Sequence, residues 1–430
     1  MKSGNAEPGR GGQPVKKKED NKAAAEQKDT WVKRRHRVIR RVLGPFIKLL
    51  CVLLYGVRIE KYSPEEGAPC LVLYNHQTPF DQFFVSLTFK EPVYHVATED
   101  IFSIGRLADL LRWLVAPIPI KKQAADLSAI RTMRQVAKEG GIIALAPEGN
   151  RTYSGKTEYI NPSVAKLIRL LKLPVALCRI EGGYGVQPRW SDRTRRGTMR
   201  SYVSEIISPE KAAKMSNEEL YDRIRNGLFV NEAVSDRKFF SARRAEYLER
   251  AVYVCPFCGL AAFRSRGNVT ECLTCHRRVR YHTDKHLSGE GYKFPFRYVN
   301  DWYEYQNTFV RGLPLSADTE HTIRSGEWFF KDEGVGIFEV IPYKKKKALL
   351  GDASVQLHAD GISISAEGQT RCIPFRDVDS AAVLGRNKLN VYYQDRIWQF
   401  KGKKRFNALK YLNFIYRFKQ GESDGEFLGL

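Results

Sequence analysis

Between about residues 60 and 207, short apolar runs alternate with segments of helical periodicity. The segment 126–141 is predicted as a helix, with Asp126 as its N-terminal cap and Gly140 at its end. The apolar runs are predicted as strands at 70–75, 93–97, 116–120, 141–146, 174–180 and 201–207. Alternating strands and helices predict an α/β domain, a mixed sheet flanked by helices, with function in the loops beyond the strand ends.

The last hundred residues follow a different pattern. Short β-rich runs with turn signals are followed by one helical segment at 405–418. Strands closed by a C-terminal amphipathic helix resemble a pleckstrin-homology-like barrel in topology. Residues 209–250 are charged and helical in period, which predicts a flank and connector.

The N-terminal region joins a basic segment to an apolar one. The first 41 residues carry 13 Lys and Arg against 5 Asp and Glu, in a leader expected to be disordered. Residues 42–57 are apolar except for Lys48, and they fall short of the roughly 20 residues that span hydrocarbon. With Pro45 inside, they predict a helix lying at a membrane interface, and a buried core helix is the alternative. No small-residue cleavage site follows, which disfavours a signal peptide.

Charge narrows the set of partners. Lys and Arg number 71 against 48 Asp and Glu, a formal net charge of +23, which favours nucleic acid or an anionic membrane surface. Basic residues beside an apolar helix favour the membrane, at the cytoplasmic face and with peripheral or monotopic attachment. Four of the eight cysteines stand singly in apolar contexts, which is typical of a reducing compartment.

The other four cysteines form two tight pairs. Cys255-x-x-Cys258 and Cys272-x-x-Cys275 are 13 residues apart, and this spacing predicts a structural zinc ribbon. A redox dithiol is the main rival, while four thiolates leave no open position for catalytic zinc. A nucleic-acid-binding zinc protein would rest on charge alone, because no stacked-aromatic signature accompanies the basic residues; no nucleic acid partner is expected.

A histidine and an aspartate follow the first strand. His76 and Asp81 are five positions apart, or 140° around an ideal helix, so they cannot share a helix face. The stretch "TPFD" predicts a helix start with Thr78 at the N-cap and Pro79 at N1, which leaves His76 on the turn within reach of the Asp81 carboxylate. The pair is either a base with its orienting carboxylate or the polar edge of a capped turn.

A second polar loop, "ALAPEGNRTYSG" at residues 144–155, also follows an apolar strand. Gly149 permits close backbone approach to a ligand, and Arg151 offers a forked cation suited to phosphate. A surface turn with a solvated arginine is the alternative. Further along, Pro174 opens the next strand.

Together these blocks resemble the lysophosphatidic acid acyltransferase (glycerolipid acyltransferase) superfamily over about residues 35–235. The matching residues are Asn75, His76 and Asp81; Pro147, Glu148, Gly149 and Arg151; and Leu173, Pro174 and Val175. The family has a further motif between the first two of these, which ends in an arginine. This chain reads "PIKK" there, so Lys122 offers a point charge in place of the forked guanidinium.

The resemblance implies a membrane-associated enzyme of phospholipid biosynthesis or remodelling. It would move an acyl chain from acyl-CoA or acyl carrier protein to a hydroxyl of a glycerolipid acceptor such as lysophosphatidic acid. His76 would accept the hydroxyl proton and Asp81 would fix the imidazole tautomer. The implied substrate-binding residues are Asn75, Lys122, Pro147, Glu148, Gly149, Arg151, Thr152 and Pro174. A non-catalytic membrane adaptor, or an acyltransferase for a lipid acceptor without phosphate, remains the alternative.

The patterns divide the chain into eight segments. They are a disordered basic leader (1–30), a membrane-associated helix (31–58), an acyltransferase domain (59–235), a helical connector (236–250), a zinc ribbon (251–285), an aromatic-rich connector (286–345), a pleckstrin-homology-like β domain with its terminal helix (346–420) and a tail (421–430).

Overall fold

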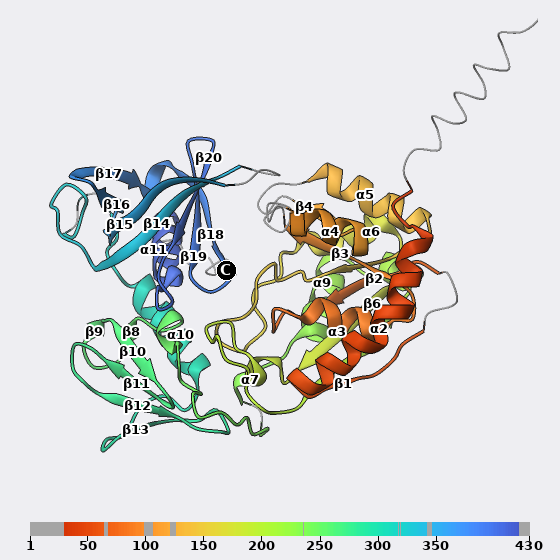
Figure 1. The fold of residues 1–430 in the computed structure, drawn as a ribbon, viewed down its shortest axis with the longest axis horizontal. Coiled ribbons are helices and arrows are strands. Elements are labelled where there is room, and N and C mark those ends of the chain that lie inside the picture. The colour runs from red at the N-terminus through yellow and green to blue at the C-terminus, as the bar shows by residue number, and fades with distance from the viewer. Residues whose placement is uncertain are drawn as a thin grey trace, which may run out of the picture.

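The computed structural model describes most of the chain after the leader. The described residues are 30–63, 68–98, 106–120, 126–234, 236–316, 318, 320–341 and 346–420. The leader up to residue 29 and the tail lie outside them. Figure 1 shows a helix-covered sheet on one side of the molecule, and two smaller β-rich parts on the other.

A seven-stranded mixed sheet forms the first part. Its strands are β1 (Val57–Ile59), β2 (Leu71–Tyr74), β3 (Val93–Thr98), β4 (Ile118–Ile120), β5 (Ile142–Leu145), β6 (Val175–Glu181) and β7 (Met199–Ile207). Their order is β1-β7-β6-β2-β5-β3-β4, and only β6 and β7 pair antiparallel. The predicted mixed α/β sheet is confirmed, with all six predicted strands present and β1 added.

Helices cover both faces of this sheet. They are α2 (Arg34–Tyr55), α3 (Asp81–Thr88), α4 (Arg106–Val115), α5 (Leu127–Lys138), α6 (Ser163–Leu171), α7 (Gly183–Val186), α8 (Pro209–Lys214) and α9 (Asn217–Leu228). Alternate residues of β2 face opposite cores: Leu73 packs with α5, α6 and α9, while Tyr74 packs with α2 and α3. Burial on both faces explains the continuous apolar runs in the sequence.

Helix α2 runs unbroken through Pro45 and carries the predicted basic and apolar segment. Its buried residues are few, namely His36, Gly44, Cys51 and Tyr55, whereas Val42 and Leu53 are 66% and 71% exposed. The alternative of a buried core helix is therefore wrong. Within the described residues, no helix has the length and apolarity needed to cross a bilayer.

A linking region and two small sheets follow. The small sheets consist of β8 (Val254–Cys255) with β9 (Gly259–Leu260), and of β10 (Phe263–Arg266), β11 (Val269–Cys272), β12 (Arg278–Tyr281) and β13 (Leu287–Gly289). The prediction of a helix at 236–250 is wrong, because the chain there makes turns and one 3-10 turn, Leu248–Arg250. Phe239 packs into a core of the seven-stranded sheet while Leu248 packs into the C-terminal core, so tertiary contacts override the helical period.

The C-terminal part is a β half-barrel preceded by helix α10 (Val299–Arg311). Its strands are β14 (Phe330–Val340), β15 (Lys347–Leu357), β16 (Gly361–Ala366), β17 (Gln369–Pro374), β18 (Val378–Leu384), β19 (Lys388–Tyr393) and β20 (Arg396–Lys401), and helix α11 (Ala408–Gln420) packs on β18 and β19. All pairings are antiparallel, in the order β17-β16-β15-β14-β20-β19-β18.

The half-barrel begins earlier than the predicted boundary at residue 346. Strand β14 lies inside the predicted connector, yet it pairs with both β15 and β20 and so occupies the centre of the sheet. Its register shifts between Asp332 and Val335 and again near Ile337. These bulges break the alternation of apolar and polar residues, which explains why the pattern did not reveal the strand.

Candidate active site

His76 and Asp81 meet where strand β2 gives way to helix α3. His76 lies on the loop after the strand, and Asp81 is the first residue of the helix. His76 Nδ1 is 2.8 Å from Asp81 Oδ2. Because a carboxylate accepts hydrogen bonds, this contact places the imidazole proton on Nδ1 and leaves Nε2 free to act as a base.

The Asp81 carboxylate is held rigidly. It is fully buried and accepts hydrogen bonds from the backbone N–H groups of Gln77 (2.6 Å) and Thr78 (2.9 Å), and from the Thr78 hydroxyl (2.6 Å). The helix begins at Asp81, two residues later than predicted, and Phe80 is its N-cap. The reach of the carboxylate back to the Thr78 N–H is nevertheless present, so Asp81 both closes the turn and orients His76.

Glu148 and Asn75 hold the loops rather than face the cavity. The two carboxylate oxygens of Glu148 accept the backbone N–H groups of His76 (2.7 Å) and Glu158 (2.8 Å). Burial raises the pKa of Glu148, an effect that these two donors oppose. Asn75 pairs through both of its amide atoms with the backbone of Ile180 on β6, at 2.7 and 2.8 Å.

The second polar loop turns toward the same strand end. Gly149 has φ 66°, in the left-handed region that glycine occupies at low cost, and it lines a cavity with Pro147 and Arg151. Thr152 lies behind the wall, where its N–H donates to the His76 carbonyl at 3.3 Å and its hydroxyl accepts from the Gly155 N–H at 2.9 Å.

Two predicted substrate-binding residues do not join this group. Pro174 precedes β6, at the strand end where its carbonyl accepts the Leu71 N–H. His76 follows the other end of β2, roughly 10 Å away at the usual rise per strand residue, so Pro174 acts in starting the strand. Lys122 lies outside the described residues.

His76 opens onto a cavity of about 900 Å³. Apolar side chains from four helices form most of its wall, namely Ile39, Leu43 and Ile47 of α2, Phe83 and Leu87 of α3, Leu111, Leu114 and Val115 of α4, and Val164 and Leu167 of α6. Strand β3 and the loop of Pro147 and Gly149 contribute the remainder. The cavity therefore combines polar groups such as His76 and Arg151 with a mostly apolar wall, which suits the binding of an amphipathic molecule.

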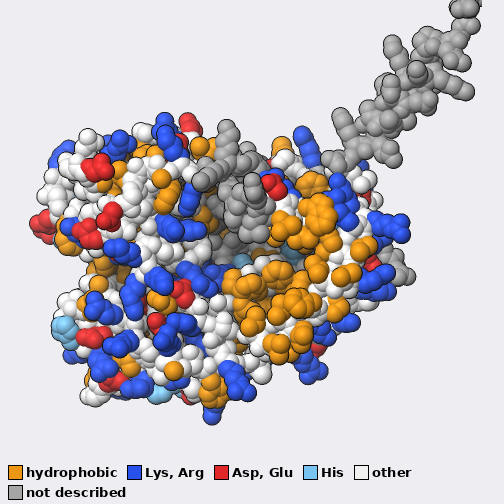
Figure 2. Space-filling model, viewed as in Figure 1, with side chains coloured by type: hydrophobic (Ala, Val, Ile, Leu, Met, Phe, Trp, Pro, Cys, Tyr) orange, Lys and Arg blue, Asp and Glu red, His pale blue; other side chains and the backbone are white. Residues whose placement is uncertain are grey.

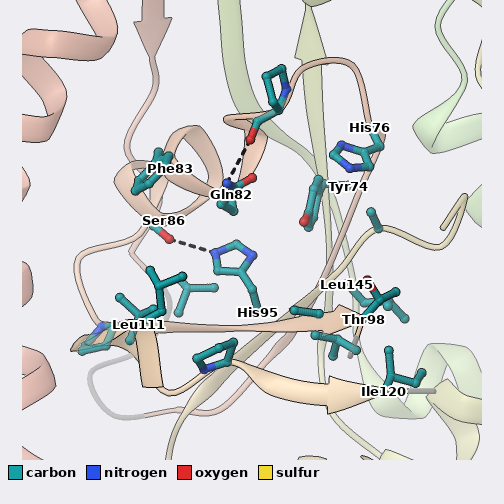
Figure 3. Close-up of a pocket in the computed structure, with 18 of the residues that line it drawn as sticks. Tyr74, His76, Gln82, Phe83, Ser86, His95, Thr98, Leu111, Ile120 and Leu145 are labelled. Atoms are coloured by element: carbon teal, nitrogen blue, oxygen red, sulfur yellow. Dashed lines mark hydrogen bonds between the residues drawn. The ribbon is translucent and has the colours of Figure 1, made fainter. Parts of the chain in front are cut away.

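Several polar side chains of the cavity wall were not anticipated from the sequence, among them Gln82, Ser86 and His95. His95 Nε2 lies 2.8 Å from the Ser86 hydroxyl, and its Nδ1 is buried without a hydrogen-bond partner among the described residues. Burial lowers the pKa of His95 to about 4. Figure 3 shows this pair on the wall, with Tyr74 packed edge-on against both histidines, His76 and His95. In the sequence, the only hint of this site was that His95 is a polar residue within the apolar run "VYHVA".

The four paired cysteines come together outside this cavity. The Sγ atoms of Cys255, Cys258, Cys272 and Cys275 all lie within 4.8 Å of one another, and the closest pairs are 3.5 and 3.7 Å apart. Four thiolates around a tetrahedral zinc at ~2.3 Å would be ~3.8 Å apart. The group could therefore hold one metal ion.

Comparison with known protein families identifies a domain in the first part of the chain. A family model described as acyltransferase matches residues 56–181, a range that contains His76, Asp81 and the second polar loop. A search of curated proteins found no match. Similar solved structures include the crystal structure of the 1-acyl-sn-glycerophosphate (LPA) acyltransferase, PlsC, from Thermotoga maritima, at 22% identity and a TM-score of 0.39, covering 46% of this chain and 82% of that one.

The family match contains the strand-end site formed by His76, Asp81 and the loop of Gly149 and Arg151. Residues 56–181 form an acyltransferase domain, and the protein that carries it is an acyltransferase.

Proposed function

We propose that this protein transfers an acyl chain from a thioester, acyl-CoA or acyl carrier protein, to a hydroxyl of a glycerolipid acceptor such as lysophosphatidic acid. The observation that carries the proposal is the His76–Asp81 pair at the mouth of an apolar cavity. A base alone fits many reactions, whereas a base beside a long apolar cavity fits acyl chemistry.

In this reaction His76 Nε2 takes the proton of the acceptor hydroxyl as its oxygen attacks the thioester carbonyl. Asp81 keeps the proton on Nδ1 and stabilises the imidazolium that forms. When the C–S bond breaks, the imidazolium returns its proton to the leaving thiolate. General base catalysis of this kind contributes about 10² to 10⁴ in rate.

The cavity would receive the acyl chain of the donor. Its wall residues from α2, α3, α4 and α6 exclude water from the chain, and His76 stands at the end where the thioester would lie. At the mouth, Gly149 leaves open space around its backbone and Arg151 offers a guanidinium for the acceptor's polar head.

The exposed face of α2 supports binding of the protein at a membrane surface. Val42, Phe46, Leu53 and Leu54 are each more than 60% exposed on this helix, and Trp113 of α4 is half exposed. Figure 2 shows the apolar side chains gathered into one patch over this side of the molecule, bordered by Lys and Arg. Such a patch with a basic border is typical of docking on an anionic bilayer.

We further propose structural zinc at the four-cysteine cluster. The sulfur spacing suits tetrahedral coordination, and with all four positions filled by thiolates the ion would tie strand β8 to strand β11 without taking part in catalysis. The small sheets would then act as a scaffold between the acyltransferase domain and the half-barrel.

Lipid mass spectrometry tests the proposed function. Cells expressing wild type should accumulate a diacyl product that cells expressing His76→Ala do not, because the variant lacks the base. His276→Ala, which changes an exposed histidine near the cysteine cluster, serves as the matched control and should behave as wild type. Equal lipid profiles for wild type and His76→Ala, with both proteins folded, would favour the non-catalytic adaptor.

A further inference from the structure

The hairpin that joins β18 to β19 ends in a fixed turn that displays Arg386. Gly385 takes φ 59°, which glycine adopts readily, and Arg386 follows it at the tip. Asn387 is anchored on both sides: its side-chain amide donates to the Gly402 carbonyl at 2.6 Å, and its carbonyl accepts the Gly402 N–H at 3.1 Å. The position of Arg386 is therefore set by the half-barrel.

Arg189 joins this hairpin to the polar loop of the active site. One of its guanidinium nitrogens donates to the Arg151 carbonyl at 2.8 Å, and another donates to the Val383 carbonyl of β18 at 2.9 Å. The guanidinium also lies 4.3 Å over the Tyr153 ring, and the residue is only 3% exposed. A buried side chain thus fixes the half-barrel against the loop that carries Arg151.

The charge of Arg386 is only partly neutralised. Its Nη1 is 3.1 Å from Asp192, but the same carboxylate already accepts two hydrogen bonds from Arg250, at 2.7 and 3.2 Å. Two guanidiniums therefore share one carboxylate. The positive charge of Arg386 reaches the Tyr55 hydroxyl and opposes the rise of its pKa that burial causes. Tyr55 packs on Phe80, just before Asp81, so the charge of Arg386 acts near the start of α3.

Arg151 makes no direct ion pair within the described residues. Its Nη1 is buried without a hydrogen-bond partner, and across the described ranges no carboxylate oxygen lies within 4.0 Å of its nitrogens. Its pKa is lowered to about 10, first because burial disfavours the charge and then because the nearby Arg189 repels it; the Asp81 carboxylate opposes this lowering, and Arg386 adds to it. A buried cation beside like charges is unfavourable unless an anion joins them.

We propose that Arg386 and Arg151 together bind the phosphate of a phosphomonoester-bearing acceptor, so that the C-terminal half-barrel completes the acceptor site. The proposal rests on the proposed acyltransferase function. Two guanidinium forks suit the oxygens of a phosphate, whereas the second motif block offers only the ammonium of Lys122. Figure 2 shows basic side chains gathered where the half-barrel meets the acyltransferase domain, beside the apolar patch.

Steady-state kinetics of the purified full chain test this assignment. Arg386→Gln should raise KM for lysophosphatidic acid about tenfold, the loss expected for one charged hydrogen bond, and leave KM for the acyl donor and kcat near wild type. With monoacylglycerol, which has no phosphate, the variant should match wild type. Arg386→Lys should recover part of the loss because it keeps the charge. Arg396→Gln is the matched control: it removes an exposed arginine of the same half-barrel, 3.8 Å from Glu339, and should change nothing.

Three results would overturn the proposal. An unchanged KM in Arg386→Gln would exclude contact with the acceptor. If Arg386→Gln raised KM equally for lysophosphatidic acid and monoacylglycerol, and Arg386→Lys did not restore it, the role of Arg386 would be structural. Weaker binding to phosphatidylglycerol vesicles with an unchanged KM would make the hairpin a contact for membrane lipid headgroups. Should wild type transfer no acyl group, the proposed function fails instead, and calorimetric binding of lysophosphatidic acid to wild type and Arg386→Gln still decides the assignment.

Discussion

In the proposed mechanism one side chain at the strand end reacts and its neighbours position it. His76 carries the free nitrogen, and Asp81 forms a hydrogen bond with its ring. Glu148 accepts the His76 backbone N–H, and Asn75 forms hydrogen bonds with the backbone of β6. The motif residues could be predicted from the sequence because their order along the chain is specific. The separation of roles could not, because it depends on which backbone amide each carboxylate reaches.

The partly buried His95 predicts an acid-sensitive contribution to stability. Its pKa is lowered by burial to about 4 in the folded chain, against an ordinary value of 6.5. Between these values the unfolded chain binds a proton that the folded chain does not, so the free energy of unfolding falls as the pH drops from 6.5 toward 4.

The variant His95→Phe should lose this part of the acid sensitivity. Urea unfolding at pH 7 and pH 5 measures the difference for wild type, for the variant and for His276→Ala, whose histidine is exposed. A His95→Phe variant that loses as much stability as wild type between these two pH values would contradict the buried, neutral state of the ring.

At the level of elements, strands with a plain apolar period were predicted well and interrupted ones were not. The six predicted runs of the acyltransferase sheet correspond to strands β2 to β7. Because both faces of this sheet are buried, these strands are continuous apolar runs that are easily recognised in the sequence. Strand β14 was assigned to a connector because its bulges interrupt the period, and the 236–250 segment was assigned to a helix whose apolar residues instead join two cores.

Helix α2 should carry the binding to membranes. The variants Val42→Asp and Leu53→Asp place a carboxylate on its exposed apolar face, so each should reduce flotation with anionic vesicles by about tenfold, because a charge is costly to bury at an interface. Leu170→Asp on α6, also an exposed leucine, is the matched control and should float as wild type. Equal flotation of all three variants would argue against α2 as the docking element.

The whole molecule joins a sheet-based enzyme domain, a four-cysteine scaffold and a half-barrel through shared buried contacts. Trp190 of the first part packs in the same core as Tyr281 of the small sheet and Leu409 of α11. Sequence patterns predicted the parts, but not the contacts between them, because contacts such as those of Trp190 pair residues more than ninety positions apart.

Removal of metal should therefore lower the stability of the whole folded chain. Metal analysis should give one zinc per chain, and a strong chelator should lower the unfolding temperature, since binding at Cys255, Cys258, Cys272 and Cys275 stabilises only the folded chain. Cys258→Ser should show the lower temperature without chelator, while Cys372→Ser, an exposed single cysteine, should not. A chain that purifies without metal at full stability would refute the zinc assignment.

The central claim is that His76, oriented by Asp81, is the base for acyl transfer at the mouth of the cavity. The most direct measurement is transfer of labelled acyl groups from acyl-CoA to lysophosphatidic acid by purified wild type, His76→Ala and Asp81→Asn. Wild type should form labelled diacyl product, and each variant should be slower by about 10² to 10⁴ while folded. A His76→Ala variant that keeps wild-type kcat would contradict the account.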